Sequence, residues 1–306
     1  MLSFLKFGLF GLELKLGKLS SLIDNLKYLL KYDSVYGLFN RQLQAEYLSE
    51  KNPSKLPWKK MDIDLVIEST GFFTKKEDAK KHLDAGAKKV LITAPSEDAD
   101  ITIVPGVNDN QYNPNKHNII SMGSCTTNCI VPVVKVINDN FGIEKGSFTT
   151  IHSYTSTQAL VDGPNKKDVR RGRSAAENII PTTTGAAKSL FQVFPDLKGK
   201  INAIAVRVPS ATVSMIDLTC KVKENLDKEK LMLVFREAEK SMNGAIAVSN
   251  EPRVSTDYRA NPNAAIVDEA MSSVIDNNLI HIIAWYDNEM GYAYRLVEMC
   301  KIISKG

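Results

Sequence analysis

Short apolar segments alternate with amphipathic ones between residues 62 and 122, and this alternation constrains the fold more than any other feature. Apolar runs at 63–67, 90–93 and 101–104 have the length of strands, and residues 75–85 have helical spacing that ends at Gly86. The runs are apolar on both faces, which is typical of buried parallel strands joined by helices. The pattern therefore predicts an α/β domain built on a mostly parallel sheet.

Longer segments in which apolar and polar residues alternate follow residue 125, at 147–152, 201–208 and 213–222. They indicate strands with one covered face, as in an antiparallel sheet. Residues 223–242 predict a helix over that sheet, and residues 292–303 predict a terminal helix. We therefore expect an α/β domain at 1–124, completed by 289–306, and an α+β domain with an antiparallel or mixed sheet at 125–288.

Composition and charge exclude several classes of protein. The chain has 306 residues, with 39 Lys and Arg against 35 Asp and Glu, and its lysines mostly alternate with acids, as at 75–81. A surface of this kind is solvated, so we expect no nucleic-acid partner. The apolar residues 1–12 are broken by Gly8 and Gly11, and no run approaches the roughly 20 apolar residues of a membrane span. We expect neither a signal peptide nor a membrane partner.

The four cysteines favour a reducing compartment. They stand at 125, 129, 220 and 300, without the paired CxxC spacing of a zinc site, and are too few for a disulfide framework in a chain of this length. We therefore expect a cytoplasmic protein without a structural metal.

One of these cysteines has the setting of a nucleophile. The segment SCTTNC at 124–129 lies between a predicted strand at 117–122 and a predicted helix at 131–137. Cys125 would then stand at a helix N-terminus, where backbone amides and the helix dipole favour the thiolate and lower its pKa. The alternative is a buried structural cysteine, the commoner role of an isolated cysteine and the one we assign to Cys129.

His152, at the end of a predicted strand, strengthens the interpretation of Cys125. A histidine close to a thiol can hold an ion pair and act as general base and acid. A structural histidine is the alternative for His152 taken alone. The pair defines only a class of nucleophile, which proteases, transferases and dehydrogenases share.

Hydroxyl groups and arginines indicate a phosphorylated substrate. Threonines at 155, 157 and 182–184, Gly185, and arginines at 170, 171, 173 and 207 supply short donors and guanidinium groups that suit phosphate oxygens. A polar loop with surface arginines is the alternative. Arg207 argues against it, because this residue interrupts an apolar strand and a half-buried arginine needs an anionic partner.

Six motifs in order carry a resemblance to a known family: SCTTNC at 124–129, HSYTSTQ at 152–158, VDGP at 161–164, RRGRSAAENIIPTTTGAAK at 170–188, RVPS at 207–210 and WYDNEMGY at 285–292. The chain resembles phosphorylating glyceraldehyde-3-phosphate dehydrogenase almost without gaps from Asp62 to the C-terminus. The resemblance implies a Rossmann-like dinucleotide-binding domain at 1–124 and a catalytic domain at 125–288.

By this resemblance, Cys125 attacks the aldehyde to form a thiohemiacetal, and His152 activates the thiol and assists hydride transfer to NAD. Inorganic phosphate then attacks the thioester on Cys125, which converts glyceraldehyde 3-phosphate to 1,3-bisphosphoglycerate in glycolysis. The implied phosphate-binding residues are Ser124, Thr126, Thr184 and Gly185 for the attacking phosphate, Thr155 and Arg207 for the substrate phosphate, and Arg171 and Thr157 nearby. Thr157 stands where many bacterial members carry an acid.

The resemblance implies NAD as cofactor and a homotetramer as the assembly. Asn288 matches the residue that holds the nicotinamide carboxamide, while Thr70, Gly71 and Thr93 match cofactor-contacting ends of parallel strands. The stretch 170–188 resembles the loop that packs between subunits.

The N-terminus departs from the family pattern. The segment Gly8, Leu9, Phe10 and Gly11 keeps only two glycines of the GxGxxG fingerprint, and Leu19 stands where the family has its ribose-binding acid. Only seven residues separate Gly11 from Leu19, so a full βαβ unit does not fit and weaker NAD binding is expected. Two alternatives follow: erythrose-4-phosphate dehydrogenase, and a cofactor-impaired non-enzymatic protein that acts as a subunit or partner.

Overall fold

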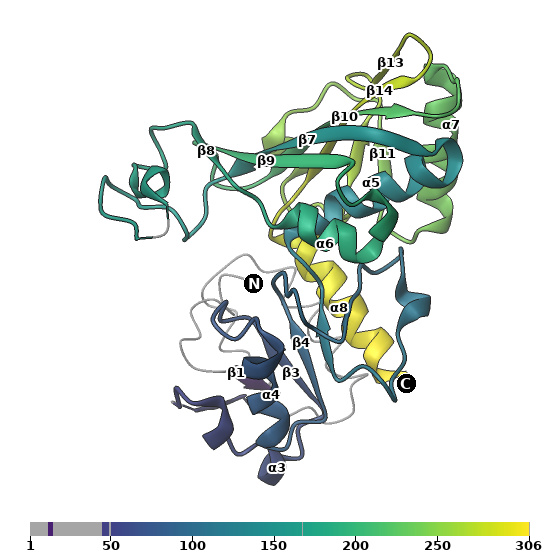
Figure 1. The fold of residues 1–306 in the computed structure, drawn as a ribbon. Helices are drawn as coiled ribbons and strands as arrows, with labels where there is room; N and C mark the ends of the chain where they lie inside the picture. Colours follow the sequence, from purple (N-terminus) through teal and green to yellow (C-terminus); the bar gives the residue numbers. More distant parts are fainter. Residues whose placement is uncertain (1–11, 15–44, 49, 167, 306) are drawn as a thin grey trace. The chain divides into compact units, whose positions relative to one another are not determined.

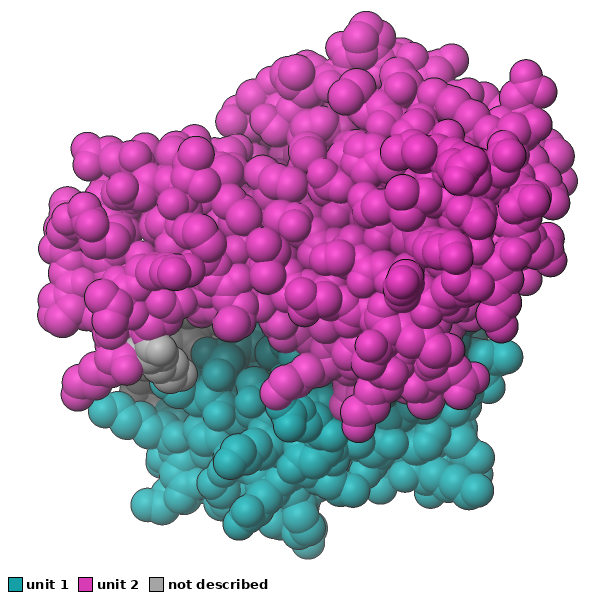
Figure 2. All heavy atoms as spheres, turned by 45° about the horizontal axis from the view of Figure 1, so that its top comes forward, with its two compact units in different colours: residues 1–124, 293–306 teal, residues 125–292 magenta. Residues whose placement is uncertain are grey.

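The structure is a computed structural model that describes residues 12–14, 45–48, 50–166 and 168–305 (Figure 1). The glycine segment at 8–11 and the ribose position at 19 lie outside the described residues. The chain divides into two compact units, residues 1–124 with 293–306 and residues 125–292, which Figure 2 shows in different colours. Each unit is described by itself.

The first unit is built on a four-stranded sheet in which all neighbouring strands are parallel. In spatial order its strands are β3 (Leu65–Glu68), β4 (Lys89–Ile92), β6 (Ile119–Ser121) and β5 (Ile101–Thr102). The side chains of β4 and β6 are almost all buried, as the apolar runs predict. The mostly parallel α/β sheet predicted for this part of the chain is therefore confirmed.

Helix α4 (Lys76–Asp84) connects β3 to β4 and packs Ala79 against Val90, Ile92 and Ile119. A second apolar cluster gathers Trp58, at the start of α3 (Trp58–Met61), with four other buried side chains: Leu56, Ile63, Val66 and Ala87. The unit also contains the 3-10 turn η2 (Pro53–Lys55), η3 (Asp109–Gln111), and an antiparallel pair of short strands, β1 (Leu12–Leu14) and β2 (Ala45–Tyr47).

Two strand boundaries differ from the sequence prediction for local reasons. The strand predicted from residue 63 begins at Leu65, because the Ile63 N–H donates to the Trp58 carbonyl in the turn that ends α3. The strand predicted for 101–104 ends at Thr102, because the Val104 N–H donates to the Asn108 side chain (2.8 Å) instead of continuing the ladder.

The second unit is built on an eight-stranded mixed sheet. Its spatial order is β11-β12-β14-β10-β7-β9-β8, with β13 paired to β14. The strands are β7 (Ile143–Ser153), β8 (Ile180–Thr182), β9 (Ile201–Val208), β10 (Ser214–Val222), β11 (Ala247–Ser249), β12 (Ile266–Asp268), β13 (Ser273–Ile275) and β14 (Leu279–Tyr286). Two pairs, β7 with β9 and β11 with β12, are parallel and the others are antiparallel.

Helix α5 (Cys125–Phe141) contacts β7, β10 and β14, and it touches α6 (Ala186–Val193) and α7 (Lys228–Ser241). The 3-10 turns η4 (Val169–Gly172), η5 (Pro195–Leu197) and η6 (Ser255–Tyr258) lie in the connections. The terminal helix α8 spans Met290–Ser304, slightly longer than the predicted 292–303.

The helix predicted from residue 223 begins five residues later, at Lys228. Asp227 caps it, with the side chain accepting from the Lys230 N–H at 2.8 Å, while the N–H groups of Lys223 and Glu224 donate to the Phe141 carbonyl. Acidic N-caps of this kind fix the start of a helix. The prediction was wrong at this end because helical spacing alone does not reveal the cap.

Candidate active site

Cys125 is the first residue of α5 and lies beside His152, which is on β7 and 3% exposed. The distance from Cys125 Sγ to His152 Nε2 is 3.4 Å. The sheet therefore holds an imidazole within hydrogen-bond reach of a thiol at a helix N-terminus. This is the arrangement in which a cysteine nucleophile is activated.

Arg207 fixes the other edge of the His152 ring. The register of the parallel strands β7 and β9 pairs His152 with Arg207, and Arg207 Nη1 lies 2.7 Å from His152 Nδ1 and donates to the Ser153 carbonyl at 2.9 Å. Burial lowers the pKa of Arg207, and the nearby Cys125 opposes that effect. The strand pairing thus places a half-buried guanidinium against the imidazole.

The tautomer of His152 depends on Arg207. A proton on Nδ1 donates to the Ser153 carbonyl (2.7 Å) and leaves the Nε2 lone pair facing Sγ, as a general base requires. A proton on Nε2 instead lets Nδ1 accept from Arg207. An anion that draws Arg207 away from Nδ1 therefore favours the tautomer in which His152 accepts the thiol proton.

Tyr286 connects the elements of the site, and sequence reasoning missed it. Its hydroxyl lies 2.9 Å from Thr126 Oγ1 and 2.8 Å from Thr150 Oγ1, and its ring meets that of His152 edge-on at 5.9 Å. Burial raises the pKa of Tyr286 well above its usual value, so the hydroxyl keeps its proton and bonds both threonines. The available signal was the WYDNEMGY motif, in which Tyr286 is the second residue.

Asn288 lies just beyond β14 with its side chain 8% exposed. Its Oδ1 accepts from Ser153 Oγ at 2.9 Å and from Ser214 Oγ at 3.4 Å. These two bonds occupy the amide oxygen and leave the amide nitrogen as the donor end. Such a donor fits the oxygen of a carboxamide, the role predicted for Asn288.

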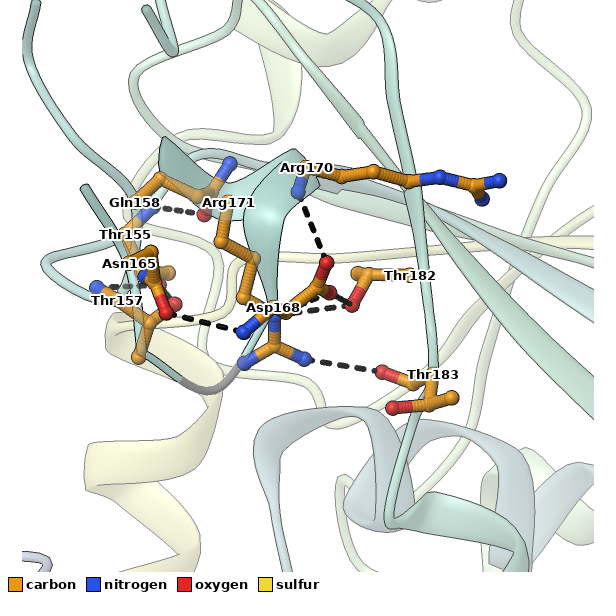
Figure 3. Close-up of polar contacts among 9 residues, drawn as sticks. All are labelled: Thr155, Thr157, Gln158, Asn165, Asp168, Arg170, Arg171, Thr182 and Thr183. Carbon is orange, nitrogen blue, oxygen red and sulfur yellow. Dashed lines mark hydrogen bonds and ion pairs between the residues drawn. The ribbon is translucent and has the colours of Figure 1, made fainter. Parts of the chain in front are cut away.

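Figure 3 shows three of the predicted phosphate-binding residues, Thr155, Thr157 and Arg171, with their polar neighbours. Thr155 and Thr157 share a hydrogen bond between their hydroxyls (2.8 Å). Arg171 donates from Nε to Thr182 Oγ1 (2.9 Å) and from Nη2 to the Thr183 carbonyl (3.3 Å). The guanidinium is thus held at the end of β8.

Thr184 and Gly185 follow Thr183 directly and precede α6, with Gly185 at the N-cap position and the Ala186 N–H donating to Thr184 Oγ1 at 3.2 Å. Helix N-termini of this kind favour anions. Hydrogen bonds connect Cys125, His152 and Arg207, and Tyr286 connects Thr126 to the His152 ring. Arg171 lies close enough to Arg207 for its charge to contribute to the lowered pKa of Arg207. Ser124 precedes Cys125 in the chain and belongs to the first unit.

Thr70 and Thr93 stand at the carboxyl ends of β3 and β4 in the first unit. The Thr93 N–H and hydroxyl both donate to the Glu68 carbonyl, at 3.0 and 3.2 Å. Gly71 has φ +76°, and a Cβ placed on it would meet nothing within 4 Å. Ligands of open α/β sheets bind outside the carboxyl ends of the strands, so this open, hydroxyl-bearing edge fits a dinucleotide.

Cysteine-dependent dehydrogenases combine a dinucleotide-binding parallel sheet with a thiol activated by histidine, and this chain has both features. Family models support this class. The model described as glyceraldehyde 3-phosphate dehydrogenase, C-terminal domain, matches residues 124–288, and that of the NAD binding domain matches residues 16–76. The chain belongs to the glyceraldehyde-3-phosphate dehydrogenase family.

Curated relatives with that name match most of the chain. Glyceraldehyde-3-phosphate dehydrogenase 1 of Bacillus subtilis is 46% identical over 293 residues, which cover 92% of this chain and 87% of the relative. The Geobacillus stearothermophilus enzyme is 45% identical over 297 residues, covering 92% and 88%. Glyceraldehyde-3-phosphate dehydrogenase 1 of Bacillus cereus is 44% identical over 310 residues, covering 96% and 92%. The resemblance seen in the sequence is therefore confirmed.

We expect alkylation to distinguish Cys125 from the other three cysteines, which are buried. Burial raises the pKa of Cys220 and of Cys300 to about 12, and that of Cys129 well above its usual value. At pH 8 a thiol with a pKa of about 12 is ionised in roughly one molecule in 10,000, and only the thiolate reacts. Iodoacetamide should label one site per native chain and four in denaturant, counted by mass spectrometry.

The matched control is Cys125→Ser, which should take no label while folded and three labels in denaturant. Labelling of Cys129 in the native wild-type protein at a rate similar to Cys125 would contradict the assignment of the reactive thiol.

Proposed function

We propose that this chain oxidises and phosphorylates glyceraldehyde 3-phosphate to 1,3-bisphosphoglycerate, with NAD as cofactor, in glycolysis. The proposal rests on the distance of 3.4 Å between Cys125 Sγ, at the start of α5, and His152 Nε2, on β7. The sequence identity to curated enzymes of that name over most of the chain supports the same substrate and cofactor.

The chain's own residues supply a nucleophile and a proton carrier. His152 Nε2 takes the Sγ proton, and the Cys125 thiolate attacks the aldehyde carbon. His152 returns this proton to the former carbonyl oxygen, which gives the thiohemiacetal and leaves the imidazole neutral again. NAD, when bound, accepts the hydride that leaves this carbon. His152 takes the hydroxyl proton as the carbon is oxidised, so that a thioester remains on Cys125. Phosphate then attacks the thioester, and the Cys125 thiolate leaves.

The polar residues around Cys125 have distinct roles in this proposal. Arg207 and Thr155 bind the substrate phosphate, while Ser124, Thr126, Thr184 and Gly185 bind the attacking phosphate. Arg171 is a further phosphate-binding arginine, and Thr157 lies beside Thr155. Because the Thr126 hydroxyl is buried against Tyr286, Thr126 offers its backbone N–H at the start of α5 rather than its side chain. Phosphate that binds Arg207 also draws it away from His152 Nδ1, which favours the tautomer that accepts the thiol proton.

For the cofactor, Thr70, Gly71 and Thr93 are the proposed contacts on the first unit, and Asn288 is the proposed partner of the nicotinamide carboxamide. The family model of the NAD binding domain begins at residue 16, so Gly8, Leu9, Phe10 and Gly11 precede the matched segment. Their contribution to the cofactor site remains a prediction.

Neither alternative from the sequence is favoured. The relatives from Bacillus subtilis, Priestia megaterium and Geobacillus stearothermophilus are named as glyceraldehyde-3-phosphate dehydrogenases, which favours that substrate. The histidine, thiol and arginine of the site are in bonding distance of one another, which a non-enzymatic protein would not require.

An assay that follows nicotinamide reduction directly tests the proposed function. With glyceraldehyde 3-phosphate, phosphate and NAD, the wild-type chain should reduce the nicotinamide, and NADP is assayed in parallel. Cys125→Ser should lower kcat by at least about 10³-fold because the nucleophile is lost, whereas Cys129→Ser should keep most of the activity. A folded wild-type sample that labels at Cys125 but turns over with neither cofactor would overturn the proposal.

Asp168 should affect phosphate binding through Arg171. Its carboxylate accepts from Thr182 Oγ1 (2.9 Å) and the Arg170 N–H (3.0 Å) and lies 3.4 Å from Arg171 Nε. The Thr182 hydroxyl, then the Arg170 N–H and the two arginines, hold the pKa of Asp168 below its usual value, so it stays charged at neutral pH. Asp168→Asn should raise the KM for phosphate about 5- to 10-fold, measured by initial rates.

Asp162→Asn is the matched control, because Asp162 pairs with Arg173 (3.0 Å) in the same loop. It should leave the KM for phosphate within about twofold of wild type. A rise of equal size in both variants would mean that loop charge, and not the position of Arg171, controls phosphate binding.

A homotetramer is the proposed assembly. The segment between β7 and β8 projects away from the sheet (Figure 1) and carries four large apolar side chains that are 71–83% exposed: Leu160, Val161, Val169 and Ile179. Exposed apolar groups gathered in this way mark protein contacts. The same segment contains most of the 170–188 stretch predicted to lie between subunits.

Native mass spectrometry should give four copies of the 33.9 kDa chain. Leu160→Glu should shift the protein to smaller species, because a charge cannot be buried in the contact. Leu233→Glu, on the outer side of α7 and 54% exposed in this unit, should leave the tetramer intact. A monomeric wild-type protein would contradict the proposed assembly.

Cytoplasmic localisation stays a prediction from cysteine usage. Within the described part of the chain, the helices are all too short or too polar to cross a membrane.

A further inference from the structure

A hydrogen-bond network of three buried side chains, Trp58, His82 and Glu68, lies in the first unit and ends at Thr70. Trp58 Nε1 donates to His82 Nδ1 at 3.0 Å, and His82 Nε2 lies 3.1 Å from Glu68 Oε2. The other oxygen of Glu68, Oε1, accepts from the Thr70 N–H at 2.8 Å and from the Thr70 hydroxyl. Trp58, His82 and Glu68 are each 3–5% exposed.

The chemistry of these groups fixes the direction of every bond. An indole N–H can only donate, so His82 Nδ1 carries no proton and accepts it. The proton of the neutral imidazole is then on Nε2, which donates to Glu68 Oε2. A carboxylate only accepts, so Thr70 donates twice to Oε1. Glu68 therefore has a donor on each oxygen, and both nitrogens of His82 are bonded.

Glu68 connects this hydrogen-bond network to the carboxyl ends of two neighbouring strands, β3 and β4. It is the last residue of β3, and its backbone carbonyl accepts the N–H and the hydroxyl of Thr93 at the end of β4. Its side chain holds Thr70, next to the open left-handed position of Gly71. Thr70 is thus held by the Glu68 side chain and Thr93 by the Glu68 backbone, at the edge where such sheets bind ligands.

Packing alone does not explain these residues. Burying a carboxylate is costly, and well-packed apolar side chains at such a position are often at least as stable. The surroundings are apolar, since Trp58 lies in one hydrophobic cluster of this unit and Ala79, one turn from His82 on α4, lies in another. Apolar side chains at these positions could not fix the orientation of the Thr70 N–H and hydroxyl, whereas the hydrogen-bond network does.

We propose that Glu68, oriented by His82 and Trp58, is a positioning residue for NAD: its carboxylate holds Thr70 in the arrangement that binds the dinucleotide. The inference rests on the proposed function, of which it deepens the cofactor site. Glu68 and His82 act through Thr70 and not on the reacting atoms, so they affect affinity for NAD and leave the Cys125 chemistry unchanged.

The first test compares two substitutions of His82 by isothermal titration with NAD in the absence of substrate. His82→Leu removes the donor to Glu68, so Thr70 is no longer held and the Kd for NAD should rise ~10-fold. His82→Gln can still accept from Trp58 and donate to Glu68, so its Kd should stay within ~3-fold of wild type. The KM for glyceraldehyde 3-phosphate and the rate of Cys125 alkylation should not change in either variant.

A double-mutant cycle with Thr70→Val separates positioning from a general loss of structure. If His82 acts through Thr70, the Kd of His82→Leu/Thr70→Val should equal that of the weaker-binding single variant. Fully additive losses, or an unchanged Kd in His82→Leu, would overturn the proposal. Should His82→Leu fail to fold by circular dichroism, Trp58→Phe removes only the donor to Nδ1 and is expected to raise the Kd ~3-fold.

The experiments distinguish failure of the positioning role from failure of the proposed function. A wild-type chain that turns over glyceraldehyde 3-phosphate, with a His82→Leu variant that binds NAD equally well, contradicts the positioning role alone. A wild-type chain that binds NAD without turnover contradicts the proposed function, and the comparison of Kd values still decides the positioning role. A wild-type chain that does not bind NAD contradicts both.

Discussion

The parallel pairing of β7 with β9 is the constraint on which the active site depends. It sets His152 beside Arg207, and the antiparallel pairing of β7 with β10 and of β10 with β14 brings Ser214 and Tyr286 to the same region. A slip of one residue in any pair would turn these side chains to the other face of the sheet. Cys125 comes from a different element, so its position beside His152 also requires α5 to pack on β7, β10 and β14.

The sequence predicted the elements of this site better than their connections. Cys125, His152 and Arg207 lie in local patterns that mark a helix start and two strands, and those patterns depend on neighbouring residues only. Register is a long-range property, so nothing in the spacing predicted the pairing of His152 with Arg207. Tyr286 was missed for the same reason: its role comes from Thr126 and Thr150, which are more than 130 residues away along the chain.

Local polar contacts explain most of the errors at element ends. Asp227 starts α7 later than helical spacing predicts, and Asn108 takes the N–H of Val104 and ends β5 early. Short strands such as β8, which contains Pro181, follow no alternation long enough to detect and form only because β9 offers a partner. The parallel sheet was predictable because its strands are buried on both faces, which leaves a continuous apolar signal in the sequence.

The two units use buried polar groups in the same way. Tyr286 bridges two threonines behind the His152 ring, and Glu68 joins the strand ends that carry Thr70 and Thr93. Each of these groups loses hydration when it is buried, and hydrogen bonds of fixed direction compensate for that loss. Apolar packing can hold a backbone in place but cannot choose which way a hydroxyl or an imidazole proton points. In both units, therefore, buried polar side chains orient the groups to which we assign binding or proton transfer.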